Sequence, residues 1–123
     1  MGLDMYAYSE DKDGRRAEIA YWRKNHRLHS WFEALWKSQQ TIEDKFLKAL
    51  DNEYDEFNCE DLELTEADLD RLSKLLKRGL PKTEFEDTNK EYNRRFRTVD
   101  KTFVERAKKE IKLGNKVIYT AWY

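Results

Sequence analysis

The sequence contains few of the residues that form disulfides or phosphate-binding loops. It has one cysteine, Cys59, so no disulfide can form within the chain, and this is consistent with a reducing cytoplasm. Proline occurs once, at Pro81, and the glycines number 4 and stand isolated from one another. A phosphate-binding or dinucleotide-binding loop needs clustered glycines, so neither motif is present.

Long apolar runs and an excess of one charge are also missing. No stretch approaches the roughly 18 consecutive apolar residues of a membrane span, and the opening lacks the pattern of a signal peptide. Lys and Arg total 24 against 25 Asp and Glu, a net charge of −1. General nucleic-acid binders usually carry a basic excess, so the composition argues against that class while leaving local basic patches open.

What is present is a charged chain rich in large rings. Aromatic residues make up 14% and charged residues 40% of the 123 positions. Disordered chains are poor in aromatics, so we expect a packed core and a single domain over residues 1–123. Segments 38–56 and 81–97 have weaker patterns and are the candidates for mobile regions.

Alternation and helical spacing predict the order of the elements. Strands are expected over residues 3–10, 17–24, 57–64 and 116–123, with Asp13-Gly14 as the turn of an opening hairpin. In the second strand, alternation places Ile19 and Tyr21 on one face and Trp22 on the other. The predicted fold is α+β, a mainly antiparallel sheet of about four strands with three or four helices packed on it.

Helical patterns follow three capping residues. Asn25 caps a first helix, Thr65 caps a second that ends at Gly79, and Thr98 or Asp100 caps the last. The first helix is amphipathic, and its apolar face, with Trp31 and Trp36, is expected to serve the core. Residues 82–98 are predicted to be a loop. Apolar spacing around residues 42–50 fits either a short helix or a mobile insertion.

Candidate chemistry is sparse. His26, His29 and Glu33 fall at i, i+3 and i+7 of the first helix, so they are candidate zinc or iron ligands, or simply a solvated helix edge. Cys59 precedes Glu60 and Asp61, whose charges disfavour a thiolate, so a buried structural cysteine is expected. We assign no catalytic residue and no cofactor.

Basic residues interleaved with rings suggest a second class of site. Such clusters can stack a base and hold a phosphate, or they can be an ordinary charged surface. The residues proposed for nucleotide or nucleic-acid contact are Tyr21, Arg23, Lys24, Arg94, Arg95 and Arg97.

The stretches "MGLDMY", "EIAYWRKNHRLHSW", "FNCEDLELTEADLDRL" and "VIYTAWY" resemble a family of small uncharacterised proteins encoded mainly by bacteriophages and prophages. Some members carry a phosphoglycerate kinase label, which a chain of this length without a phosphate loop does not support. The matching positions are Tyr21, Trp22, Arg23, Lys24, Asn25, Leu28, His29 and Trp31, with Asp4, Tyr6, Asn58 and Trp122.

The resemblance implies a protein that acts in the cytoplasm of an infected bacterium by binding a host protein, for example one of a defence system. Rings and arginines also suit protein interfaces, so we expect a non-enzymatic binding protein. A nucleotide- or nucleic-acid-binding module and a small enzyme or metal protein centred on His29 are the alternatives. Polar candidates could converge if the hairpin and the third strand lie beside the first helix: Asp4, Tyr6, Arg23, Asn25, His29 and Asn58.

Overall fold

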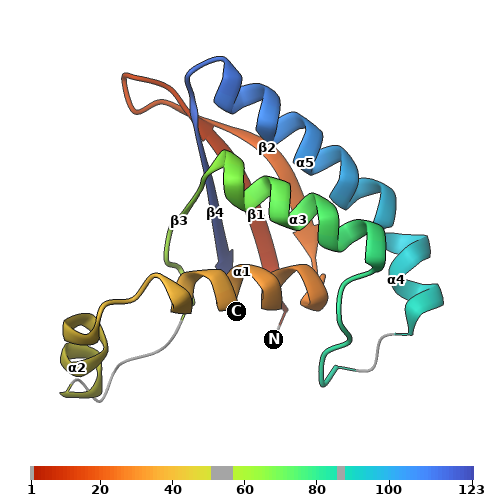
Figure 1. The fold of residues 1–123 in the computed structure, drawn as a ribbon, viewed down its shortest axis with the longest axis horizontal. Helices are drawn as coiled ribbons and strands as arrows, with labels where there is room; N and C mark the ends of the chain where they lie inside the picture. The colour runs from red at the N-terminus through yellow and green to blue at the C-terminus, as the bar shows by residue number, and fades with distance from the viewer. Residues whose placement is uncertain (1, 51–56, 86–87) are drawn as a thin grey trace.

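The computed structural model describes residues 2–50, 57–85 and 88–123. Four strands form one antiparallel sheet in the order β2-β1-β4-β3 (Figure 1). The elements along the chain are β1 (Asp4–Glu10), β2 (Arg16–Arg23), α1 (His26–Ser38), α2 (Ile42–Leu50), β3 (Leu62–Leu64), α3 (Glu66–Arg78), α4 (Asn89–Arg95), α5 (Arg97–Lys112) and β4 (Lys116–Trp122). The predicted α+β class is confirmed.

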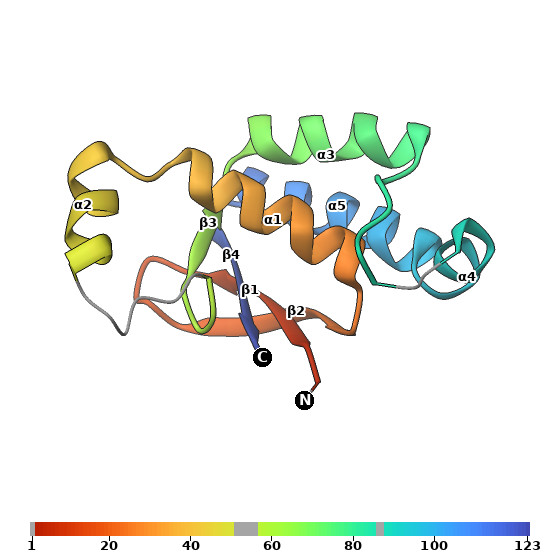
Figure 2. The same cartoon turned by 90° about the horizontal axis from the view of Figure 1, so that it is seen from below.

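Helices α1, α3 and α5 lie on one side of the sheet, as Figure 2 shows. The side chains that alternate toward these helices are buried, for example Met5 and Ala7 of β1 and Tyr119 and Ala121 of β4. Phe32 of α1 stacks on the Tyr119 ring, with the two centroids 3.9 Å apart, and fastens the helix to the sheet. The hydrophobic core therefore lies between this helical layer and one sheet face.

A bulge in β2 changes the predicted alternation. Ala7 pairs with Ala20 and Tyr8 with Glu18, so Ile19 is the extra residue between these pairs. Ile19 and Trp22 are both buried, whereas Tyr21 is exposed. The prediction that Ile19 and Tyr21 share a face was wrong because one inserted residue reverses the alternation. The side chain of Arg106 donates to the Ile19 carbonyl at 3.1 Å.

The predicted caps of α1 and α3 are confirmed. The Asn25 side chain accepts from the backbone N–H of Leu28, and Thr65 forms a reciprocal capping box with Asp68. Trp36 is buried and Trp31 packs partly buried against the core, as the apolar face of α1 predicted.

Several local predictions were wrong. Strand β3 is confined to Leu62–Leu64, because the chain turns at residues 57–59 before it pairs with β4. Cys59 is exposed and lies in that turn with a φ of 63°, so it is not a buried core residue. Residues 82–98 include helix α4 and the start of α5. Thr98 and Asp100 both lie inside α5, whose N-cap is Phe96, so neither of them caps that helix.

Residues 42–50, for which the sequence fitted either a short helix or a mobile insertion, form helix α2. Its apolar side chains are exposed, with Ile42 at 88%, Phe46 at 61% and Leu50 at 67%. Mobility of segments 38–56 and 81–97 stays a prediction, and residues 51–56 and 86–87 lie outside the described part. Among the described helices, none is long and apolar enough to cross a membrane.

Candidate functional site

The sheet face opposite the helices carries a cluster of aromatic rings. Tyr6 of the inner strand β1 is its centre, and its ring centroid lies 5.2 Å from Tyr21, 6.2 Å from Tyr8 and 6.4 Å from Trp122. Trp122 is 61% exposed and Tyr21 46%. We call Tyr6, Tyr8, Tyr21 and Trp122 the ring face.

Register explains why these rings meet. Tyr6 pairs with Tyr21 on β2 and with Thr120 on β4, and Trp122 follows two positions after Thr120 on the same face. The bulge at Ile19 brings Tyr21 to this side. The rings therefore come from three strands, and the cluster depends on the pairing of the whole sheet.

Two predicted site residues border the ring face. Asp4 pairs with Arg23 across β1 and β2, and the Tyr21 hydroxyl donates to the Asp4 carboxylate at 2.7 Å. This hydrogen bond raises the pKa of Tyr21 above its usual value. The structure thus brings Asp4, Tyr6, Tyr21 and Arg23 together. The sequence had grouped Asp4, Tyr6 and Arg23 but not Tyr21.

The charges around the rings are largely paired with one another. Arg16 bonds to Glu10 at 2.9 Å and to Asp61 at 2.8 Å, and these bonds raise the pKa of its guanidinium. Lys116 lies 4.0 Å from Glu63. Two basic groups on this face, Arg16 and Lys116, therefore lie beside carboxylates, and Arg23 at its border lies across from Asp4.

Asn25, another candidate, points away from the ring face into the core. Its amide nitrogen donates to both oxygens of Asp100, at 3.0 and 3.2 Å, and Trp22 Nε1 donates at 2.9 Å. The Tyr92 hydroxyl donates to the same carboxylate at 2.6 Å. Burial raises the pKa of Asp100 to about 6, against these hydrogen bonds, which favour the charged form. This network joins β2, α1, α4 and α5.

His29 lies at the rim of a cavity of about 500 Å³ whose lining includes Lys24, His26, Glu33 and Tyr123. The candidates Lys24, His26 and His29 therefore border one cavity, whose lining does not include Arg23. His26 stacks on Phe85 with the ring centroids 3.7 Å apart. Burial lowers the pKa of His29 to about 4, so its imidazole is neutral at pH 7 and a weak base. Within the described ranges, no three His, Cys, Asp or Glu side chains are arranged to hold a metal ion.

Of the other candidates, Asn58 lies beside the His29 cavity through Tyr123, and the arginines lie elsewhere. Asn58 accepts from the backbone N–H of Tyr123 at 2.9 Å. Arg94 pairs with Glu91 on the surface of α4, and Arg95 lies over the Phe96 ring. Arg97 lines a different cavity, between α3 and α4. The six polar candidates do not meet in one cluster, because Asp4, Tyr6 and Arg23 lie by the ring face whereas Asn25 and His29 lie on the side of the sheet that the helices cover.

Tyr8 was missed as a site residue, although the sequence carried a signal for it. In "LDMYAYSE", Tyr8 shares the alternation of Asp4 and Tyr6. Because alternate residues of a strand share a face, that spacing was sufficient to include Tyr8.

Comparison with known proteins adds no further identification. No model of a protein family matches the chain, and no curated protein or solved structure matches it.

Proposed function

We propose that this chain is a non-enzymatic protein-binding domain and that the ring face is its contact surface. The observation that carries the proposal is the cluster of exposed Tyr21 and Trp122 with the partly buried Tyr6 and Tyr8, on a sheet face that helices α1, α3 and α5 leave open. Tyr and Trp supply large contact areas at low entropic cost, and together with Arg they dominate the hot spots of protein interfaces.

The charges of this face favour a protein partner over a nucleic acid. Binding to a phosphate backbone needs several available cations, because released counterions provide much of the affinity. Here Arg16 and Lys116 are paired with carboxylates, and Asp4 and Glu18 add negative charge beside the rings, so Arg23 is the one bordering cation in the described residues to which no salt bridge is assigned. The fitting partner therefore presents Arg or Lys next to apolar side chains, which can lie over exposed rings in cation–π contacts.

The kind of partner, a protein of a bacterial host, is inferred from the sequence resemblance alone. A bacteriophage protein works in the host cytoplasm, so the partner we propose is a bacterial host protein, such as a component of a defence system. His29 supports the non-enzymatic part of the proposal, because an imidazole with a pKa of about 4 is poorly matched to acid–base catalysis at neutral pH.

The test is a pull-down from bacterial lysate with matched surface variants. The double variant Tyr21→Ala/Trp122→Ala removes exposed rings from the ring face, and Ile42→Ala/Phe46→Ala removes apolar side chains from α2 that are at least as exposed. A protein captured by the wild type should be lost with the first variant and kept with the second. The purified pair should then form a discrete complex by light scattering, weakened about 100-fold by the first variant.

Other results would overturn the proposal. Equal capture by the wild type and by Tyr21→Ala/Trp122→Ala would place the interface elsewhere. A dimer of this chain that dissociates in that variant would make a second copy the occupant of the ring face. Capture of nucleic acid that falls steeply with salt would show that the charge argument is wrong.

A further inference from the structure

The His29 cavity, whose volume is about 500 Å³, lies at one end of the sheet (Figure 1). The start of β1 meets the ends of β2 and β4 there, so Leu3, Lys24 and Tyr123 line the cavity from the strand ends. His29 and Glu33 line it from helix α1. A volume of this size is common for the sites of small-molecule ligands.

One nitrogen of the His29 ring has no partner in the described part of the protein. The residue is only 9% exposed, and its Nδ1 lies 2.7 Å from the Tyr119 hydroxyl oxygen in the core. Nε2, on the opposite side of the ring, forms no hydrogen bond with the described residues. A buried polar atom without a partner is costly, and His29 borders the cavity, so a molecule bound there is the natural partner of Nε2.

The burial of Tyr119 indicates which nitrogen of His29 carries the proton. Tyr119 is fully buried, and among the described residues its hydroxyl has a hydrogen bond only with Nδ1. If Nδ1 carried the proton, the hydroxyl proton would lack an acceptor among those residues. The favoured arrangement is therefore a hydroxyl that donates to Nδ1, with the proton of the neutral ring on Nε2. The cavity is thus offered an N–H donor, which fits a carboxylate.

Charges of opposite sign flank this donor along the chain. Glu33 lies one helical turn after His29, so roughly 6 Å separate the two residues along the helix axis. Lys24, just before α1, forms no salt bridge with the described residues. Lys37 contacts only the Oε1 atom of Glu33, at 3.4 Å. The lining therefore carries a cation on one side of His29 and a carboxylate on the other.

Aromatic rings complete the lining of the His29 cavity. The Phe85 ring is 48% exposed and stacks on His26, with the centroids 3.7 Å apart. The Tyr123 ring meets His29 edge-on, with the centroids 5.1 Å apart. Glu84, next to Phe85, adds a second carboxylate. The cavity thus combines a hydrogen-bond donor, charges of both signs and a surface for an apolar group.

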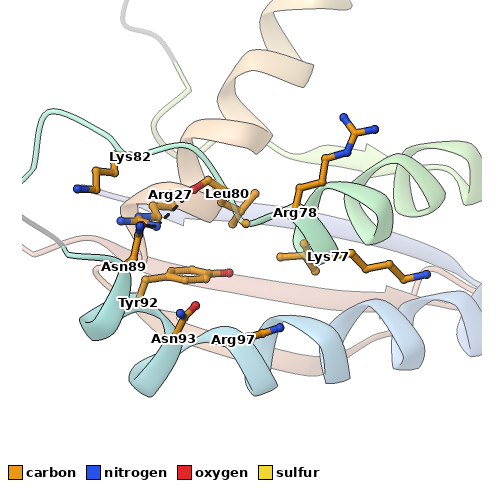
Figure 3. A pocket seen from close by; sticks show the side chains of 11 residues that line it. Arg27, Lys77, Arg78, Leu80, Lys82, Asn89, Tyr92, Asn93 and Arg97 are labelled. Atoms are coloured by element: carbon orange, nitrogen blue, oxygen red, sulfur yellow. Dashed lines mark hydrogen bonds between the residues drawn. The ribbon is translucent and has the colours of Figure 1, made fainter.

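A second cavity, of about 440 Å³, lies between α1, the end of α3 and α4, and it lacks this combination (Figure 3). None of the described residues that line it is acidic. The Lys77 and Lys82 side chains point in opposite directions there, so their charges do not meet at one ligand. A small molecule that carries both a positive and a negative charge therefore fits the His29 cavity better.

We propose that the His29 cavity binds a free α-amino acid with an apolar or aromatic side chain. The carboxylate of the ligand accepts from Nε2 of His29 and lies on the side of Lys24. Its ammonium group contacts Glu33, and its side chain lies against Phe85. Residues one turn apart on a helix face the same side, so His29 and Glu33 can hold the two neighbouring charged groups of one amino acid. An acid or an amine alone would use only part of the site.

The test is calorimetric titration of the full chain with phenylalanine and with leucine. The matching acids, hydrocinnamate and isocaproate, lack the ammonium group, and the matching amines, phenethylamine and isopentylamine, lack the carboxylate. At least one of the two amino acids should bind, and its acid and its amine should each bind about tenfold more weakly, because each loses a charge-assisted hydrogen bond.

Two surface variants should separate the two ends of the site. Glu33→Gln should weaken the amino acid and its amine about tenfold and leave its acid unchanged. Lys24→Gln should weaken the amino acid and its acid and leave its amine unchanged. The control is Glu91→Gln, because Glu91, like Glu33, is paired with a cation of its own helix but does not line this cavity. The control should bind every ligand like the wild type.

NMR spectra of the imidazole nitrogens test the role of His29 directly. They should show the proton on Nε2 and a shift of that resonance when the amino acid is added. The proposal is overturned if neither amino acid binds, if an acid or amine binds as tightly, if Glu91→Gln loses as much affinity as Glu33→Gln, or if the Nε2 resonance does not move at saturation. Tyr21→Ala should keep full affinity, so this site and the ring face can fail separately.

Discussion

The Nδ1 atom of His29 lies 2.7 Å from the hydroxyl oxygen of Tyr119, so this hydrogen bond joins helix α1 to strand β4 across 90 positions of sequence. Burial keeps both groups uncharged at neutral pH, since it lowers the pKa of His29 to about 4 and raises that of Tyr119 well above its usual value. The pKa of Asp100 is shifted in the opposite direction from that of His29, because burial raises it to about 6.

These two displacements predict opposing pH dependences of stability. The folded pKa of His29 is below its ordinary 6.5, so its contribution to the free energy of unfolding is lost as the pH falls from 6.5 toward 4. The folded pKa of Asp100 is above its ordinary 3.8, so its contribution is lost as the pH rises from about 4 to about 6. Each is on the order of 3 kcal/mol, and they largely cancel.

Single substitutions should separate the two effects. Between pH 4.5 and 6.5, the free energy of unfolding from urea titrations should rise with pH in Asp100→Asn, relative to the wild type. It should fall with pH in His29→Asn. Curves that run parallel to the wild type in both variants would show that neither group titrates with a displaced pKa.

Asn25 should be intolerant of a charge even though aspartate is an equally good helix cap. Asn25→Asp keeps an oxygen for the N–H of Leu28 but sets a carboxylate against Asp100, where an amide now donates. We expect a loss of about 3–5 kcal/mol in the free energy of unfolding at pH 7, and a smaller loss at pH 4. Thr88→Asp, at the cap of α4, is the control and should change stability by less than about 0.5 kcal/mol. Equal losses in both variants would refute the argument.

Two phenylalanines on neighbouring helices should differ sharply in their effect on stability. Phe32 is fully buried and stacks on Tyr119, so Phe32→Ala should cost about 3–5 kcal/mol. Phe46 of α2 is 61% exposed, and Phe46→Ala should stay within about 0.5 kcal/mol of the wild type. Thermal or urea unfolding checks both, and a large loss in Phe46→Ala would mean that α2 packs against the domain.

The turn at Cys59 holds a side chain in the left-handed region, with a φ of 63°. Asparagine adopts this conformation more readily than other non-glycine residues, whereas a β-branched side chain resists it. Cys59→Asn should therefore be neutral or stabilising, and Cys59→Val should lower the free energy of unfolding by about 1–2 kcal/mol. The exposed thiol of the wild type should also react with a thiol reagent in the folded state. Equal stability of the two variants would contradict the assignment of strain.

Local signals in the sequence were sufficient for most of the fold. The alternation in "LDMYAYSE" puts Met5 and Ala7 on one face of a strand, where both are buried in β1, and the caps at Asn25 and Thr65 mark the starts of α1 and α3. These features depend on residues within a few positions of one another. The bulge at Ile19 could not be predicted, because it is defined by the register of β2 against β1.

The sites were harder to predict because their members meet only in three dimensions. Asp100 was read as a helix cap from its neighbours, yet its donors Trp22 and Asn25 precede it by 78 and 75 positions. The cavity lined by Arg27, Lys77 and Arg97 is likewise formed by residues of three separate helices, α1, α3 and α5. Spacing along the chain carries no information about such groupings, whereas the ring face follows from alternation once the register is known.

The contact between Arg106 and the Ile19 carbonyl has a consequence for how the molecules behave at high concentration. Strand β2 lies at the outer edge of the sheet, where free backbone groups could recruit a strand from another molecule. The Arg106 guanidinium donates to one of these acceptors, the Ile19 carbonyl, at the bulge. The bulge also interrupts the regular spacing of backbone groups that a new strand would need for pairing. With this bond made, the Ile19 carbonyl is no longer free to accept from the backbone of a strand in another molecule.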